Sequence, residues 1–190
     1  MVASRTKNHI SDEDHMQKEK FITVMAILDD ATQCRLESVH NEWCFAYGED
    51  SHTRLTPFHI TLGSYAPEDT DKIVARIIAV CKETKQIPVR FSGLNHFGNV
   101  VYFLEPEISE ELFNLHLHFD SDYANGYPGW MPHVTLYRHQ KPTEITGNTQ
   151  ILAQIQDAKI VGIELGEFFP AKKILRVLFE GYGETNDEIN

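Results

Sequence analysis

Along this chain, apolar residues recur with two different periods, and the segments that carry them predict alternating strands and helices. Residues 21–28 form a near-continuous apolar run, which is typical of a strand covered on both faces. We expect a helix from about Asp30 to a stop near Gly48, followed by a strand over about 57–65. Residues 73–81 then carry apolar side chains at helical spacing behind an acidic cluster, which suits the N-terminus of a helix.

The second half of the chain continues the alternation of strand and helix patterns. Residues 89–104 predict a hairpin that turns at 95–99, because Gly and Asn favour tight turns. Ser109 is a candidate N-cap for the helix that follows. The remaining expected elements are a strand after the loop at 126–129, a weaker helix near 148–156, and strands over 161–166 and 175–180.

These elements form two unequal copies of a strand, helix, strand theme, which predicts fold class α+β. At 190 residues, the chain is long enough for one sizeable core or for two small lobes that share one. We expect residues 20–183 to form a single domain. A polar extension at 1–19 precedes it, and an acidic tail at 184–190 follows it.

Two short segments, one in each half, are nearly identical: His59-Ile60-Thr61-Leu62 and His133-Val134-Thr135-Leu136. Alternate side chains of a strand point to opposite faces, so each histidine should share a face with the threonine two residues later. The aliphatic residues would then fill the other face. If the two strands face each other across a cleft, one site gains two imidazoles and two hydroxyls, a set of groups that suits phosphate chemistry.

Composition and charge narrow the class of protein. No apolar run approaches the roughly 20 residues of a membrane helix, and the polar start is no secretory signal, so we expect a soluble, cytoplasmic protein without membrane contact. The net charge of −11 and the lack of a basic stripe disfavour long double-stranded nucleic acid as a partner. Three cysteines without CxxC spacing indicate reduced thiols rather than disulfides or zinc ligands.

The two tetrads, the 74 positions between their histidines and the order of the elements resemble the 2H phosphoesterase superfamily. Within it, the chain is most similar to the LigT-like, or 2′-5′ RNA ligase, branch over about residues 20–180. The resemblance implies two βαβ-type lobes with antiparallel sheets around a central cleft, and no metal or other cofactor. It also implies that His59 and His133 are the catalytic pair and that Thr61 and Thr135 bind nonbridging phosphate oxygens.

The chemistry can be stated from the residues themselves. Opening a 2′,3′-cyclic phosphodiester needs a base that deprotonates water and an acid that protonates the departing ribose oxygen. Histidine titrates near neutrality, so one neutral and one protonated imidazole can divide these tasks. The threonine hydroxyls can stabilise charge on the phosphorane oxygens if they are preorganised. Which histidine serves as the base stays open at this stage.

Strand phase extends the predicted site beyond the tetrads. Tyr137 lies in phase with His133, so we expect it to contact substrate, and His139 is in phase as well. Arg138 falls on the opposite face and is expected to be a surface or salt-bridge residue. Tyr65 is in phase with the first motif, but we expect it only to close the end of its strand.

Two further aromatic residues are candidates for substrate binding. Trp130 precedes the second motif, and Phe97 lies in the predicted turn, so either ring could stack on a nucleobase. Packing in the core or anchoring of a loop is the alternative interpretation for each of them.

We therefore predict a metal-independent phosphoesterase that hydrolyses a 2′,3′-cyclic or 2′-5′ phosphodiester of a nucleotide or RNA end, and we expect a monomer. A noncatalytic module that binds nucleotides or RNA ends with the same groups is the first alternative. The second is a structural protein in which both His-x-Thr strands are core segments. That would require each buried polar pair to find other partners, because unpaired buried polar groups are costly.

Overall fold

The fold is seen in a computed structural model, whose described residues are 19–50, 56–120, 129–142, 144–145 and 149–182. The described residues do not include most of the predicted N-terminal extension, the predicted acidic tail, or residues 121–128 of the loop before the second motif. Strands and helices alternate along the described chain, and the strands form two antiparallel sheets, as expected for an α+β fold.

The larger sheet, sheet A, has five strands, and the apolar run at the start of the domain forms one of its interior strands. In spatial order its main path is β2 (His59–Tyr65), β1 (Phe21–Leu28), β7 (Ala158–Phe168) and β3 (Ile87–Val89), while β8 (Lys172–Leu178) also pairs with β7. Because β1 pairs with β2 on one side and β7 on the other, seven of its eight residues are buried. The first motif strand, β2, lies at an edge of this sheet.

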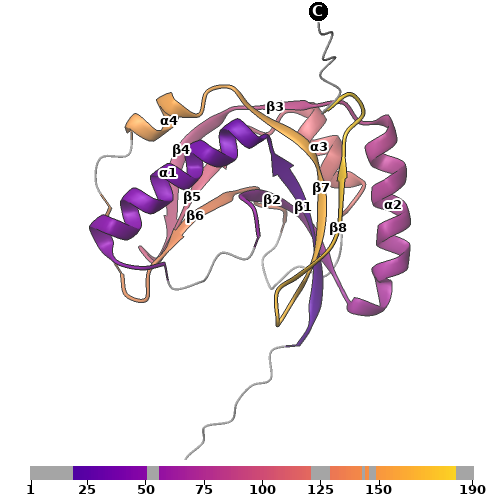
Figure 1. The fold of residues 1–190 in the computed structure, drawn as a ribbon, viewed down its shortest axis with the longest axis horizontal. Helices are drawn as coiled ribbons and strands as arrows, with labels where there is room; N and C mark the ends of the chain where they lie inside the picture. The colour runs from indigo at the N-terminus through magenta and orange to yellow at the C-terminus, as the bar shows by residue number, and fades with distance from the viewer. Residues whose placement is uncertain (1–18, 51–55, 121–128, 143, 146–148, 183–190) are drawn as a thin grey trace, which may run out of the picture.

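The smaller sheet, sheet B, has three strands in the order β4 (Phe91–Phe97), β5 (Val101–Pro106) and β6 (Val134–Arg138). Strands β4 and β5 form the predicted hairpin, but β4 continues to Phe97, so the turn lies at 98–100 rather than at 95–99. Strand β6 carries the second motif from Val134 onward, and His133 immediately precedes it. Like β2, strand β6 lies at the edge of its sheet. The two motif strands contact each other at the centre of the molecule, where the sheets meet (Figure 1).

The helices cover the outer faces of the sheets. The longest are α1 (Asp30–Tyr47), which lies along sheet B, and α2 (Thr70–Glu83), which packs on β7 and β8 of sheet A (Figure 1). The shorter elements are the 3-10 helix η1 (Pro67–Asp69), α3 (Glu110–Leu117) and α4 (Thr149–Gln154). Among the described residues, no helix is both long enough and apolar enough to span a bilayer.

Local signals place the helix ends close to where the sequence predicts them. Asp29 caps α1 by accepting a hydrogen bond from the backbone N–H of Thr32, and Gly48 ends the helix with a positive φ of 103°. Ser109 caps α3 by accepting a hydrogen bond from the backbone N–H of Leu112. These caps fix the helices that back the two sheets.

Each sheet has one face toward its helices and one face toward the site. In β1, Ile22, Val24 and Ala26 belong to the packed core shared with α2, whereas Met25 faces the other way. Cross-strand pairing puts Thr61 on the same face as Met25. The polar residues of the first motif therefore point away from the helix-covered core.

Candidate active site

The two motif histidines adopt the same local arrangement. Nδ1 of His59 lies 2.8 Å from the carbonyl oxygen of Pro57, and Nδ1 of His133 lies 2.9 Å from that of Met131. A carbonyl oxygen only accepts hydrogen bonds, so each Nδ1 must carry the proton. Nε2 is then the nitrogen that can exchange a proton with a substrate. The two motifs are thus repeated in side-chain orientation as well as in sequence.

The environment of His59 favours its neutral form. The pKa of His59 is lowered to about 4. Burial is the main cause, and positive charge on His133 and Arg138 acts in the same direction, whereas the hydrogen bond to Pro57 opposes the shift. The influence of His133 and Arg138 shows that the two motifs share one electrostatic site. At neutral pH, His59 is a neutral imidazole that carries its one proton on Nδ1 and can accept a second proton at Nε2.

Each motif strand contains a β-bulge at the same position relative to its histidine. In β2, Val24 pairs with Gly63 and Met25 pairs with Thr61, so Leu62 is the extra residue. In β6, the same irregularity leaves Leu136 without a partner of its own. A bulge shifts the alternation of side chains by one residue. The residue five positions after each histidine therefore returns to the face of the site.

The bulges change which residues accompany the motifs. Arg138 pairs with Val101 on the face that carries Thr135, and its charge reaches His59. The expectation that Arg138 lies on the opposite face is therefore wrong. In the first motif the equivalent residue is Ser64, which is buried and shares a 3.2 Å hydrogen bond with Thr23. The cation is thus supplied by the second motif alone.

The same shift removes Tyr137 from the site. Tyr137 is fully buried, its ring meets Trp43 of α1 edge to face, and its hydroxyl donates a 2.8 Å hydrogen bond to the carbonyl oxygen of Gly48. The expected placement of Tyr137 beside His133 is wrong, because strict alternation was assumed across the bulge. Nε2 of His139 lies 3.0 Å from the carbonyl oxygen of Tyr47, so this side chain also faces α1.

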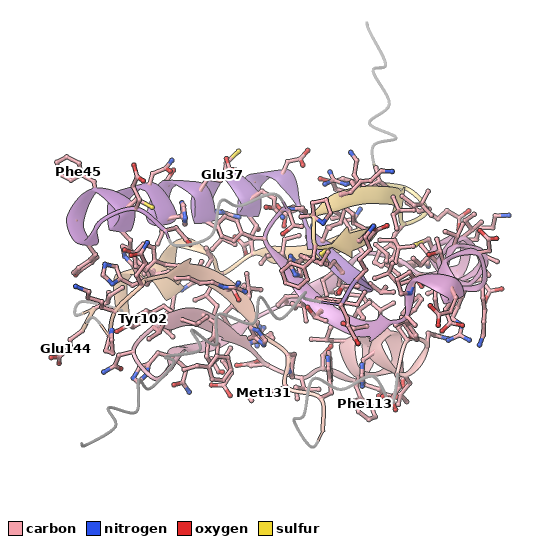
Figure 2. The ribbon with its side chains drawn as sticks, turned by 90° about the horizontal axis from the view of Figure 1, so that it is seen from below. Glu37, Phe45, Tyr102, Phe113, Met131 and Glu144 are labelled. Carbon is pink, nitrogen blue, oxygen red and sulfur yellow. The ribbon has the colours of Figure 1, made fainter. Side chains whose placement is uncertain are left out.

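Aromatic residues of sheet B surround the second histidine. The ring centroids of Phe97 and Phe103 lie 5.7 and 5.2 Å from that of His133, and the two phenylalanines are 4.4 Å apart. Phe103 is buried, whereas Phe97 is half-buried. In the view of Figure 2, the exposed Met131, two residues before His133, lies at the lower border of the molecule. The structure thus brings Phe97 to the site, with part of its surface open.

Trp130 connects the approach to the second motif with the strand of the first. Its Nε1–H donates a 2.8 Å hydrogen bond to the carbonyl oxygen of Thr61. Its ring stacks on the imidazole of His116, with 4.0 Å between the ring centroids. Nδ1 of the buried His116 in turn lies 2.8 Å from the carbonyl oxygen of Leu62. Two successive carbonyls on the free edge of β2 thus have partners, and one face of the Trp130 ring is covered.

Thr61 and Thr135 are half-buried on the faces that carry the motif histidines, in agreement with the expected strand phase. Each hydroxyl is two residues from its histidine, on a strand held by sheet hydrogen bonds. In the part of the chain that the structure describes, no group of three or more His, Cys, Asp or Glu residues is placed to hold a metal ion. The side chains that the two motifs bring together carry imidazole, hydroxyl and guanidinium groups.

A family model for the 2′-5′ RNA ligase superfamily matches residues 28–162, more than two thirds of the chain and including both motif strands. The chain belongs to the 2′-5′ RNA ligase superfamily. This membership confirms the resemblance to 2H phosphoesterases that rests on the two tetrads. A search of curated protein sequences finds no match.

Solved structures of the superfamily fold extend over most of the chain. LigT of E. coli in its apo form is 13% identical, with a TM-score of 0.56, and the match covers 85% of this chain and 98% of that one. TT0787 of Thermus thermophilus is 16% identical, with a TM-score of 0.61 and coverage of 85% and 99%. At such identities the likeness is one of fold, and it agrees with two lobes around the motif strands.

Proposed function

We propose that this protein is a metal-independent phosphoesterase that hydrolyses a 2′,3′-cyclic or 2′-5′ phosphodiester of a nucleotide or RNA end. The observation that carries the proposal is a pair of imidazoles at the N-terminal ends of two contacting edge strands, each with Nδ1 directed at a backbone carbonyl so that Nε2 can exchange a proton. E. coli LigT, which has a similar fold, has been solved in complex with phosphate and with 3′-AMP, and these ligands support the proposed class of substrate.

His59 is the general base of the proposed reaction. With a pKa of about 4 in the free protein, it is neutral at pH 7 and can accept a proton at Nε2. The anionic phosphodiester, once bound, raises this pKa toward neutrality, because a nearby negative charge favours the imidazolium. The water proton moves to His59 as the water oxygen forms its bond to phosphorus.

His133 is the general acid. Protonated at both nitrogens, it donates from Nε2 to the ribose oxygen as the bond between that oxygen and phosphorus breaks. The products are a phosphomonoester and a free hydroxyl, with one proton taken up by His59 and one given up by His133. Exchange with solvent restores the starting protonation states.

Charge on the phosphorane is stabilised by three groups. Thr61 and Thr135 donate hydrogen bonds to the nonbridging oxygens, and the Arg138 guanidinium offers positive charge beside them. All three side chains belong to edge strands fixed by sheet pairing, so they need little reorganisation during the reaction. Phe97, and the free face of Trp130, provide apolar surface for the base of the substrate.

The test is incubation of the pure protein with 2′,3′-cyclic nucleotides, 2′-5′ dinucleotides and 3′-5′ dinucleotides, all in the presence of EDTA. We expect turnover of at least one of the first two classes and none of the third. Binding of the same compounds without turnover would identify a noncatalytic module instead. If the protein neither binds nor turns over any of these compounds, the proposal is contradicted. Activity that EDTA abolishes would contradict the proposed metal independence.

A further inference from the structure

Strand β8 carries basic residues on the face that it shares with the first motif. Cross-strand pairing aligns Thr61 of β2 with Met25 of β1, Glu164 of β7 and Arg176 of β8 in one row across sheet A. Directly opposed residues in antiparallel strands point to the same face. Arg176 therefore lies at the far border of the surface that has Thr61 at its other end.

A third bulge adds a second cation to this border. Leu165 pairs with Leu175 but Gly166 pairs with Lys173, so Ile174 is the extra residue of β8. Lys173 thus shares the face of Arg176, although the two residues are three positions apart. Lys172 pairs with Glu167 and lies on the opposite face of the same strand. We call Lys173 and Arg176 together the β8 basic pair.

A buried carboxylate holds one member of this pair in place. Glu164 is 3% exposed, and its Oε2 accepts hydrogen bonds from Nε and Nη2 of Arg176 at 2.7 and 2.6 Å. The arginine side chain is 41% exposed, so Nη1 can donate to a ligand from a guanidinium whose orientation is already fixed. The Lys173 side chain is exposed and supplies a full positive charge.

We propose that the β8 basic pair binds backbone phosphates of an RNA strand whose end lies at the motif histidines. This inference rests on the proposed function, and it selects an oligonucleotide end rather than a free mononucleotide as the preferred substrate. Cations that face the site are notable in a chain with a net charge of −11, because the overall field repels RNA. A local basic border can overcome that repulsion within a screening length.

The dimensions of the sheet set the reach of the proposed subsite. Three steps between neighbouring strands, at about 4.8 Å each, separate Thr61 from Arg176 by about 14 Å along the row. A mononucleotide held by its phosphate at the motifs cannot place that same phosphate at β8. The phosphates of neighbouring nucleotides can span the distance, so the β8 basic pair distinguishes RNA ends from mononucleotides.

The test is binding of a 5′-labelled hexaribonucleotide that ends in a 3′-phosphate, followed by fluorescence anisotropy, with adenosine 3′-phosphate as the mononucleotide competitor. Lys173→Gln should raise the Kd of the hexamer about three- to tenfold. It should also reduce the steepness of the fall of the logarithm of the association constant with the logarithm of the salt concentration by about 0.7. Lys172→Gln is the matched control, since it removes the same charge from the opposite face. It should change the Kd less than twofold.

Arg176 needs a paired substitution, because Arg176→Gln alone leaves the buried Glu164 carboxylate without its partner. The double variant Glu164→Gln with Arg176→Gln keeps the pair neutral and should also weaken hexamer binding, with unchanged affinity for the mononucleotide. Equal effects of Lys172→Gln and Lys173→Gln, or a hexamer that binds no tighter than the mononucleotide, would overturn the inference. Mononucleotide turnover by the wild type tests the proposed function separately.

Discussion

The low pKa of His59 predicts a specific loss of stability in mild acid. In the folded protein His59 stays neutral down to about pH 4, whereas in the unfolded chain it takes up a proton near its ordinary value of 6.5. As the pH falls below 6.5, protonation stabilises the unfolded state alone, so the free energy of unfolding decreases. Below about pH 4 the folded state also binds the proton, and this contribution stops changing.

The size of this loss in the free energy of unfolding follows from the shift in the pKa of His59. A change from 6.5 to about 4 corresponds to about 3 kcal/mol in total, at about 1.4 kcal/mol per pH unit. About 2.5 kcal/mol of this is lost between pH 7.5 and 4.5. His59→Asn removes the titrating group, while its side-chain N–H can still donate to the carbonyl oxygen of Pro57. The variant should therefore lack this part of the pH dependence.

The assay is urea unfolding of the wild type and His59→Asn at several values between pH 4 and 8. The difference between their free energies of unfolding should fall by about 2 to 3 kcal/mol between pH 7.5 and 4.5. Other groups that titrate in this range, common to both proteins, largely cancel in the difference. His118→Asn, at an exposed position on the C-cap of α3, controls for the substitution itself. A difference that stays constant within about 0.5 kcal/mol would refute the burial of a neutral imidazole.

Three substitutions test the geometry around the motifs. Arg138→Gln should lower kcat by about 10² with the fold intact, because it removes a cation from the phosphorane; a change below threefold in steady-state kinetics would remove Arg138 from the site. Tyr137→Phe should leave kcat unchanged and cost about 1 kcal/mol in urea unfolding, whereas a large loss of activity would restore it as a substrate contact. Gly63→Ala should destabilise by more than about 2 kcal/mol, since its Cβ would collide with the carbonyl oxygen of Phe119. Gly93→Ala, with open space around its Cβ, is the control, and equal melting temperatures for the two variants would contradict the close approach.

Much of the architecture could be predicted from the periodicity of the sequence, because period alone separates strands from amphipathic helices. The apolar run of β1, the cap at Ser109 and the β4–β5 hairpin all lie where the pattern indicates. The pairing of strands into two sheets could not be derived in this way, since it depends on contacts between residues far apart in the chain.

The composition of the site shows where periodicity fails. The two histidines and two threonines follow from strand alternation, but Arg138 and Tyr137 exchange faces because of one bulge. The sequence does carry a signal of the bulge, since Leu136 is followed directly by a second large apolar residue, Tyr137, where strict alternation would place a polar one. Both residues are buried in the structure. Gly63 inside β2 is a comparable signal in the first motif. The contacts of Trp130 and His116 with the edge of β2 carry no sequence signal, because they join separate segments.

The most direct measurement is the hydrolysis of adenosine 2′,3′-cyclic phosphate by the wild type, His59→Asn, His133→Asn and the double variant. All four proteins are first shown to be folded by circular dichroism, and the reactions contain EDTA. If the two imidazoles act together as base and acid, kcat falls about 10²- to 10⁴-fold in each single variant. The double variant then has a kcat only slightly below that of the less active single variant. A single variant that keeps wild-type turnover within threefold would contradict two-histidine catalysis.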